Sequence, residues 1–222
     1  MGLIIIGGDG NAYYANVDSD HHFQTNPRPP AYGTLGYYRS ANVSGAITAT
    51  LGAASNLWTL RGTNASNLCI VQNVQMIAYV ASTITTSVAF IAELFIARSY
   101  TANATGGTSY VPASGQQKMK TSMGNSLMGD LQICGTSGLS AGTWTLDNQP
   151  IGYAEGNSGT TTGTVFFGNG NNGVLYKQDT TNTYPIVLAQ NEGLVIQNVL
   201  AGPATGTFTI GVAVEWGEVA TY

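Results

Sequence analysis

Asp18, Asp20, His21 and His22 form the only cluster of metal-type ligands in the chain. Neighbouring side chains of an extended segment point to opposite sides, so one metal ion could take a single histidine together with Asp18 or Asp20. A zinc site needs three or four protein ligands, and no second cluster completes the shell. A Ser-His-Asp or Cys-His arrangement would also have to be built here, because the chain has only 2 histidines. We predict a surface or interface segment and no cofactor.

Paired carboxylates are the other arrangement that could do chemistry. Hydrolysis of a glycosidic bond uses two acidic side chains about 5–9 Å apart. The candidates are Glu93, Glu155, Glu192, Glu215 and Glu218. Glu192 lies in a glycine-containing turn, and Glu215 and Glu218 flank a strand end, where charge protects a sheet edge from unwanted pairing. We predict that the chain is not an enzyme. An enzyme would remain an alternative only if the Asp18 cluster converged with another carboxylate.

Charged residues make up only 8% of the 222 positions, whereas glycine supplies 29. A soluble globular chain carries roughly 25% charged residues. A surface this poor in charge indicates contact with other protein, as in an assembly component. The net charge is −4, and the 7 basic residues are scattered singly, so the chain offers no basic patch for a phosphate backbone. We expect no nucleic-acid partner.

The sequence has neither the pattern of a secretory signal nor that of a membrane span. Residues 1–8 lack a basic region, and their apolar run is too short for a signal core. The most apolar window, Leu68–Ala97, is broken by polar residues. Cys69 and Cys134 lie in apolar, strand-like surroundings, where a free cysteine behaves as a small hydrophobic side chain. We expect synthesis in a reducing cytoplasm, two buried reduced thiols and no membrane partner.

After Leu57, hydrophobic residues recur with a period of two, which is typical of strands. The clearest case is Thr207–Trp216, where five large apolar residues share one face. Further strands are predicted at 57–61, 68–80, 88–98, 131–133, 163–167, 186–188 and 194–199. Because 88–98 is apolar on both faces, we expect it to be covered on both sides. Gly, Asn, Ser and Pro clusters separate the segments at short intervals, and this pattern predicts an all-β sandwich.

A single helical piece is expected. Met119, Met123 and Leu127 recur at four-residue spacing, but Gly115, Gly124 and Gly129 bracket and interrupt them. Interior glycine costs about 1 kcal/mol in a helix, so a turn or two is the most that this segment permits.

The first 55 residues differ in composition from the rest of the chain. Prolines make Asn26–Pro30 extended, because each proline fixes its own φ and restricts the preceding residue. Five tyrosines are too many for a solvated linker, since large aromatic surface in water usually marks a contact. They are Tyr13, Tyr14, Tyr32, Tyr37 and Tyr38. We predict an extended N-terminal arm, residues 1–55, that docks through these tyrosines, and a sandwich body, residues 56–222.

Two long loops are expected to decorate the body, Tyr100–Gln117 and Gly152–Asn182. They carry four tyrosines that could stack on sugars: Tyr100, Tyr110, Tyr153 and Tyr176. A receptor- or glycan-binding tip is therefore the alternative function, and glycan the alternative partner.

Several stretches, which together reach across most of the chain, resemble a group of tailed-bacteriophage virion proteins. They are GYYRS at 36–40 with GAI at 45–47, LFIARSYTA at 94–102, KTSMGNSL at 120–127, PIVLAQNEG at 185–193 and VAVEWGEV at 212–219. The resemblance implies a jelly-roll-like antiparallel β-sandwich that serves as a capsid decoration, cement or head-spike protein, often a homotrimer. The implied partners are the major capsid protein and other copies of the chain, and the implied location is the capsid surface of the virion. The group carries no diagnostic site motif, so no binding residue follows from it.

Overall fold

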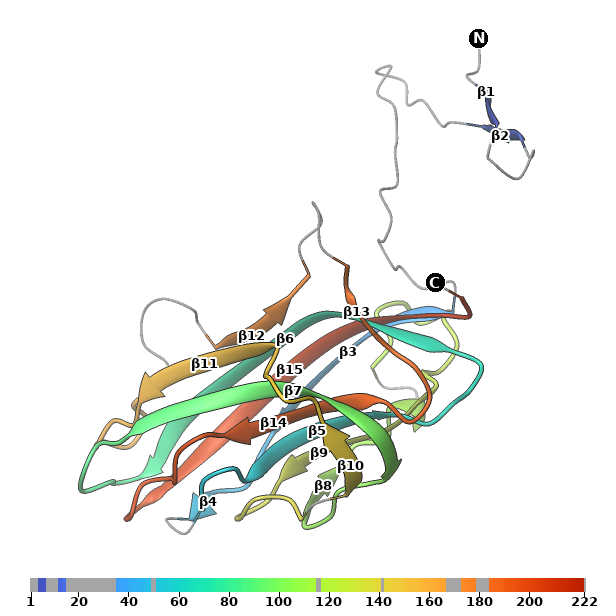
Figure 1. Cartoon of the computed structure of the whole chain (residues 1–222). Helices are drawn as coiled ribbons and strands as arrows, with labels where there is room; N and C mark the ends of the chain where they lie inside the picture. The colour runs from blue at the N-terminus through green and yellow to red at the C-terminus, as the bar shows by residue number, and fades with distance from the viewer. Residues whose placement is uncertain are drawn as a thin grey trace, which may run out of the picture. The chain divides into compact units, whose positions relative to one another are not determined.

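The computed structural model describes residues 4–6, 12–14, 35–48, 51–114, 117–140, 142–166, 173–178 and 184–221. The chain divides into two units, Met1–Pro30 and Ala31–Tyr222. In the first unit, β1 (Ile4–Ile6) pairs antiparallel with β2 (Ala12–Tyr14). The second unit, called the body below, is a sandwich of two antiparallel sheets (Figure 1).

The six-stranded sheet is organised around β15 (Thr207–Val219), which pairs along its length with β6 (Leu68–Ser82). On the other side of β15 lie β3 (Gly36–Val43) and the short β4 (Ile47–Thr48). Two more strands, β12 (Val174–Lys177) and β13 (Ile186–Leu188), pair with the far side of β6. The strand order is therefore β12-β6-β15-β3, with β13 beside β6 and β4 beside β15.

The seven-stranded sheet has the order β10-β7-β14-β5-β9-β8, and its seventh strand, β11, also pairs with β7. Its long strand is β7 (Ala89–Ala102), flanked by β14 (Gly193–Asn198) on one side and by β10 (Thr143–Leu146) and β11 (Gly152–Asn157) on the other. Beyond β14 come β5 (Asn56–Gly62), β9 (Met128–Cys134) and the three-residue β8 (Gly107–Ser109).

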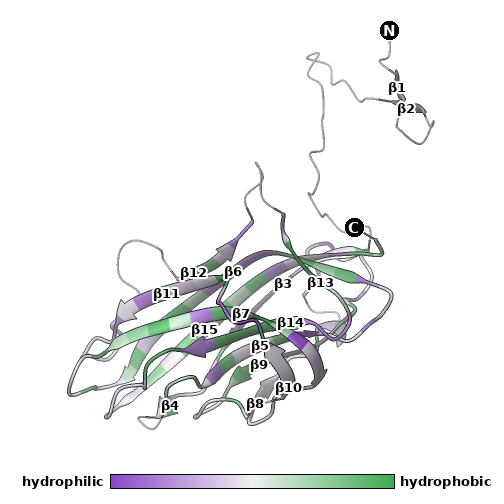
Figure 2. Cartoon of the chain, viewed as in Figure 1, coloured by the Kyte–Doolittle hydropathy of each residue, from purple (hydrophilic) through white to green (hydrophobic). Residues whose placement is uncertain are grey.

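The core lies between the sheets because alternate residues of the long strands face inward. On β15 the inward residues are Phe208, Ile210, Val212, Val214 and Trp216, all buried. Hydrophobic residues recur along the strands of both sheets in Figure 2. Phe90, Phe166 and Phe208 pack together with ring centroids 5.3–5.5 Å apart. Such aromatic clusters contribute roughly 0.5–1.5 kcal/mol per pair beyond area burial.

The all-β sandwich predicted from the periodicity is confirmed. The expected strands at 57–61, 68–80, 131–133, 186–188 and 194–199 match β5, β6, β9, β13 and β14. Both cysteines are buried and free, as expected. In the described part of the chain the only helical segment is one 3-10 turn, η1 (Pro112–Ser114).

The boundary placed between residues 55 and 56 is wrong, because β3 and β4 are strands of the body. All eight residues of β3 pair with β15, from Gly36 opposite Glu218 to Val43 opposite Gly211. Tyr38 is 1% exposed and belongs to the core. Glycines and the inward polar residues Ser40 and Asn42 hide the strand pattern in this stretch.

Three local predictions also need correction. Instead of a helical turn or two around Met119, the chain there lies along β3, with the Met119 amide donating to the Tyr37 carbonyl. Of the strand expected at 163–167, residues 163–166 exchange backbone hydrogen bonds with β6 but form only an isolated bridge, Val165 with Tyr79, and residue 167 lies outside the described residues. On β7, alternate residues from Phe90 to Leu94 are buried while those between them are partly exposed, so most of this strand is covered on one side.

Candidate interaction surfaces

The residues with metal-type side chains do not assemble a site in the part of the chain that can be examined. Asp18, Asp20, His21 and His22 lie outside the described residues. Among the described residues, no group of three or more His, Cys, Asp or Glu side chains could hold a metal ion.

Glu218 is a structural acceptor at one end of the sandwich. Its side chain is 0% exposed. Oε1 accepts from the Trp216 indole N–H at 2.9 Å and from the Ser126 hydroxyl. Oε2 accepts from the Leu127 amide at 2.8 Å and from Asn67 Nδ2 at 3.2 Å. Four neutral donors thus satisfy a buried carboxylate, which holds the chain at 126–127 against the end of β15.

Glu192 and Glu215 are each bound to an arginine. Glu192 contacts Arg98, which also bonds Asp147, and Glu215 pairs with Arg39 at 3.1 Å. Ion pairs this exposed contribute little to stability, typically up to about 1 kcal/mol, but they neutralise surface charge.

Glu93 and Glu155 share one face of the seven-stranded sheet. Glu93 lies opposite Tyr153, and Glu155 lies opposite Ile91, so the two carboxylates are diagonal neighbours on adjacent strands. Glu155 is exposed and Glu93 half-buried. They form an acidic pair on an open sheet surface.

The five tyrosines assigned to the arm have different locations. Tyr13, Tyr14 and Tyr32 have side chains outside the described residues. Tyr38 faces the core, which corrects its assignment as an arm residue. Tyr37 points to the opposite face of β3, where its hydroxyl donates to Glu215 Oε2 at 3.2 Å.

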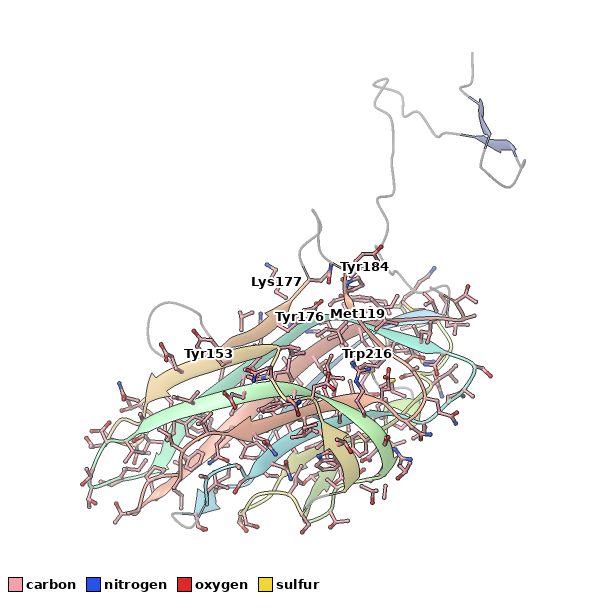
Figure 3. All side chains as sticks on the ribbon, in the orientation of Figure 1. Met119, Tyr153, Tyr176, Lys177, Tyr184 and Trp216 are labelled. Carbon is pink, nitrogen blue, oxygen red and sulfur yellow. The ribbon has the colours of Figure 1, made fainter. Side chains whose placement is uncertain are left out.

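The tyrosines considered for sugar stacking are mostly covered. Tyr100 is 0% exposed and contacts Trp144 edge-on, with centroids 4.7 Å apart, so it offers no ring face to a ligand. Tyr110 and Tyr176 are half-buried against the core. Tyr153 is 57% exposed, and Tyr184, which the sequence reasoning missed, is 90% exposed. Figure 3 labels both at the outside of the ribbon.

The outward side of the central strands in the six-stranded sheet is the surface that carries exposed apolar side chains together with few charges. We call it the β3–β15–β6 face, and it is made by Tyr37, Arg39, Ala41 and Val43 on β3, Gly211, Ala213, Glu215 and Gly217 on β15, and Asn73, Gln75 and Ile77 on β6. Val43 is 54% and Ile77 52% exposed. Its one cation and one anion, Arg39 and Glu215, are paired with each other.

No protein-family model matches the sequence, and no curated protein matches it. Within the described ranges, no helix has the length and apolar character needed to cross a membrane.

Nothing in the sequence pointed directly to the β3–β15–β6 face, because its residues come from three segments that lie far apart in the chain. One signal was present: on β15 the positions between the large apolar residues are glycine, alanine and threonine together with Glu215. Such small residues are unusual on a solvent-facing strand, where β-branched and polar side chains are favoured.

Proposed function

We propose that this chain is a structural virion protein of a tailed bacteriophage, a capsid decoration or cement protein that binds the major capsid protein and neighbouring copies. It acts by binding, without turnover, at the outside of the capsid after synthesis in the host cytoplasm. The proposal rests on the sequence resemblance and on the low charge of the body's surface.

Most acidic side chains of the described body are buried or paired with arginine. The acidic side chains are Glu93, Asp130, Asp147, Glu155, Glu192, Glu215 and Glu218. Glu218 and Asp130 are buried among neutral donors, the latter accepting from Ser109 and Gln132. Three more are bound to arginine, which leaves Glu93 and Glu155. Hydroxyl and amide groups can be buried in an interface without the desolvation penalty of charges.

The N-terminal unit also supports a role in attachment. A two-stranded hairpin such as β1–β2 is marginal in water by itself, because it buries too little apolar surface. Its strands read Ile-Ile-Ile and Ala-Tyr-Tyr. A segment of this kind suits attachment to another protein, where it can add strands or bury side chains.

Electron microscopy of intact virions labelled with an antibody against the body tests the proposal. We expect gold particles over the capsid. Label confined to the tail, or virions without any label although the infected host makes the protein, would contradict a capsid role.

The alternative function is a receptor- or glycan-binding tip, and it is favoured by Tyr153 and Tyr184, the two most exposed of the described aromatic rings. Exposed tyrosine rings can stack on sugars while their hydroxyls remain solvated. A glycan array with the wild-type chain and the Tyr153→Ala and Tyr184→Ala variants separates the two functions. Binding that either variant abolishes would favour the tip.

A further inference from the structure

The outward residues of β3 and β15 form a ladder in which neighbours differ in size or charge. Tyr37 lies opposite Gly217, Arg39 opposite Glu215, Ala41 opposite Ala213 and Val43 opposite Gly211. The β3 side of the ladder is thus a ridge that includes Tyr37, Arg39 and Val43. The β15 side is a floor with two glycines and one carboxylate. Ridge and floor lie side by side on a single face.

We propose that two copies of this chain pack together through the β3–β15–β6 face, around a two-fold axis that runs along the strands between β3 and β15. The proposal rests on the proposed function, in that it specifies how neighbouring copies meet. An axis in this position lays β3 of each copy over β15 of the other, and sheets packed in this aligned way are common in β-sandwiches. A two-fold contact uses the same patch on both copies, so the patch must be self-complementary.

The shape of the face meets that requirement. The axis places Val43 of each copy over Gly211 of the other, where no side chain stands on β15. A Cβ atom at Gly211 would lie 2.9 Å from Ile77 Cγ1, so the Ile77 side chain leans over this glycine. Val43 of one copy would therefore pack against Ile77 of the other. These two side chains are about half exposed in the single chain, and the contact would cover both.

The charges meet the requirement as well. Because Arg39 and Glu215 are direct neighbours in register, the same axis places Arg39 of each copy over Glu215 of the other. The Arg39 side chain is 53% exposed, which leaves guanidinium N–H groups free to reach a second carboxylate. Opposite charges then face each other at two symmetry-related positions.

The outward side of β7 and β11 does not offer the same charge complementarity. Glu93 and Glu155 form an acidic pair on the outward side of β7 and β11. A two-fold axis along the strands between β7 and β11 would place Glu93 of one copy over Tyr153 of the other, so no cation would face either carboxylate there. Self-association therefore favours the β3–β15–β6 face.

Sedimentation of the purified full-length chain, without capsids, tests the proposal. We expect the wild type to form a dimer, or an even-numbered assembly if a second contact also operates. Arg39→Glu alone and Glu215→Arg alone should each halve the mass, because each face then presents like charges to its copy. An equal mixture of the two variants should restore the wild-type mass, because the glutamate introduced at position 39 of one copy faces the arginine introduced at position 215 of the other.

Matched controls separate association from folding. Arg98→Glu changes an arginine that is 45% exposed and ion-paired outside this face, and it should leave the mass unchanged. Ile77→Glu should dissociate the assembly, whereas Tyr153→Glu, at a similarly exposed position on the other sheet, should not. Circular dichroism and thermal melting confirm that each variant remains folded.

Three results would overturn the proposal: a wild-type monomer at about 100 μM, a trimer whose mass the Arg39 and Glu215 variants do not change, or a mixture of variants that stays dissociated. In each case labelling of the capsid by the antibody would leave the proposed function standing. Loss of capsid labelling with an intact two-fold dimer would instead remove the proposed function alone.

Discussion

Tyr38 stacks on Trp216 where β3 pairs with β15, with ring centroids 5.6 Å apart and ring planes 26° apart. The two residues are direct partners in the ladder, and neither is more than 1% exposed. The Tyr38 hydroxyl donates to the Gly124 carbonyl at 3.1 Å, and the Trp216 indole donates to Glu218. One stacked pair therefore ties β3, β15 and the segment at 124 into a single end of the core.

We predict that the body begins near residue 31 and cannot begin at residue 56. A chain starting at Ala31 retains β3 and β4 and should show the same cooperative melting as the full chain. A chain starting at Asn56 loses Tyr38 and leaves the β15 edge unpaired, so it should be unfolded or aggregated. Near-ultraviolet circular dichroism compares the two. Equal melting of both shortened chains would show that β3 is dispensable.

The chain starting at Ala31 also tests the role of the N-terminal unit. We expect this chain to remain folded but not to attach to particles that lack the native protein, because it has lost β1 and β2. Co-sedimentation with such particles measures attachment, and the full chain is the control. Attachment of the shortened chain at full occupancy would assign the anchor to the body instead.

The free energy of unfolding should fall at alkaline pH because Tyr38 is buried as a neutral phenol. Burial raises the pKa of Tyr38 from 10.0 to about 12, and the charge of Glu218 adds to the rise. The folded state therefore holds this proton to higher pH than the unfolded state. The contribution of the protonated Tyr38 to the free energy of unfolding is complete below pH 10 and is lost as the pH rises from 10 to 12.

The Tyr38→Phe variant isolates this effect. It should cost about 1 kcal/mol at pH 7 through the lost hydrogen bonds, but its unfolding free energy should fall less steeply between pH 10 and 12. Urea unfolding at a series of pH values measures both. If the unfolding free energy of the two proteins falls equally steeply between pH 10 and 12, the pKa of the phenol does not change on folding.

Glu218 should be needed for stability. Glu218→Ala leaves four donors without their acceptor inside the fold, and we expect a loss of roughly 2–4 kcal/mol in the free energy of unfolding. Glu218→Gln keeps one acceptor oxygen and should cost less. Glu155→Ala, which removes an exposed carboxylate from β11, should stay within about 0.5 kcal/mol of the wild type. Urea unfolding ranks the variants, and a loss in Glu218→Ala no larger than that of the Glu155→Ala control would contradict the network.

The two thiols should be inert in the native protein. Burial raises the pKa of Cys134 to about 12. Burial, followed by the charge of Glu218, raises the pKa of Cys69 well above its usual value. Because the thiolate is the reactive form, a thiol reagent at about pH 8 should detect neither cysteine until the chain is denatured, when it should detect both. A native Cys69–Cys134 bridge seen by mass spectrometry would refute this.

Period-two patterning made much of the fold predictable from the sequence. A strand with one buried face has to alternate, so β15 and much of β6 could be located without any tertiary information. The low charge was likewise a property of composition. Strands such as β3 and β11 escaped because inward polar residues or glycines interrupt their alternation.

Local patterning was enough to establish that the chain alternates apolar and polar residues in segments of strand length, that it is poor in charge, and that its cysteines lie in apolar strands. Only the three-dimensional fold shows which strands are neighbours. Pairing joins residues far apart in the chain, such as Arg39 with Glu215 and Tyr38 with Trp216, and local patterning carries no information about distant partners. The ridge and floor of the β3–β15–β6 face exist only once that register is set, because a shift of one residue would turn Val43 and Arg39 to the other side of the sheet.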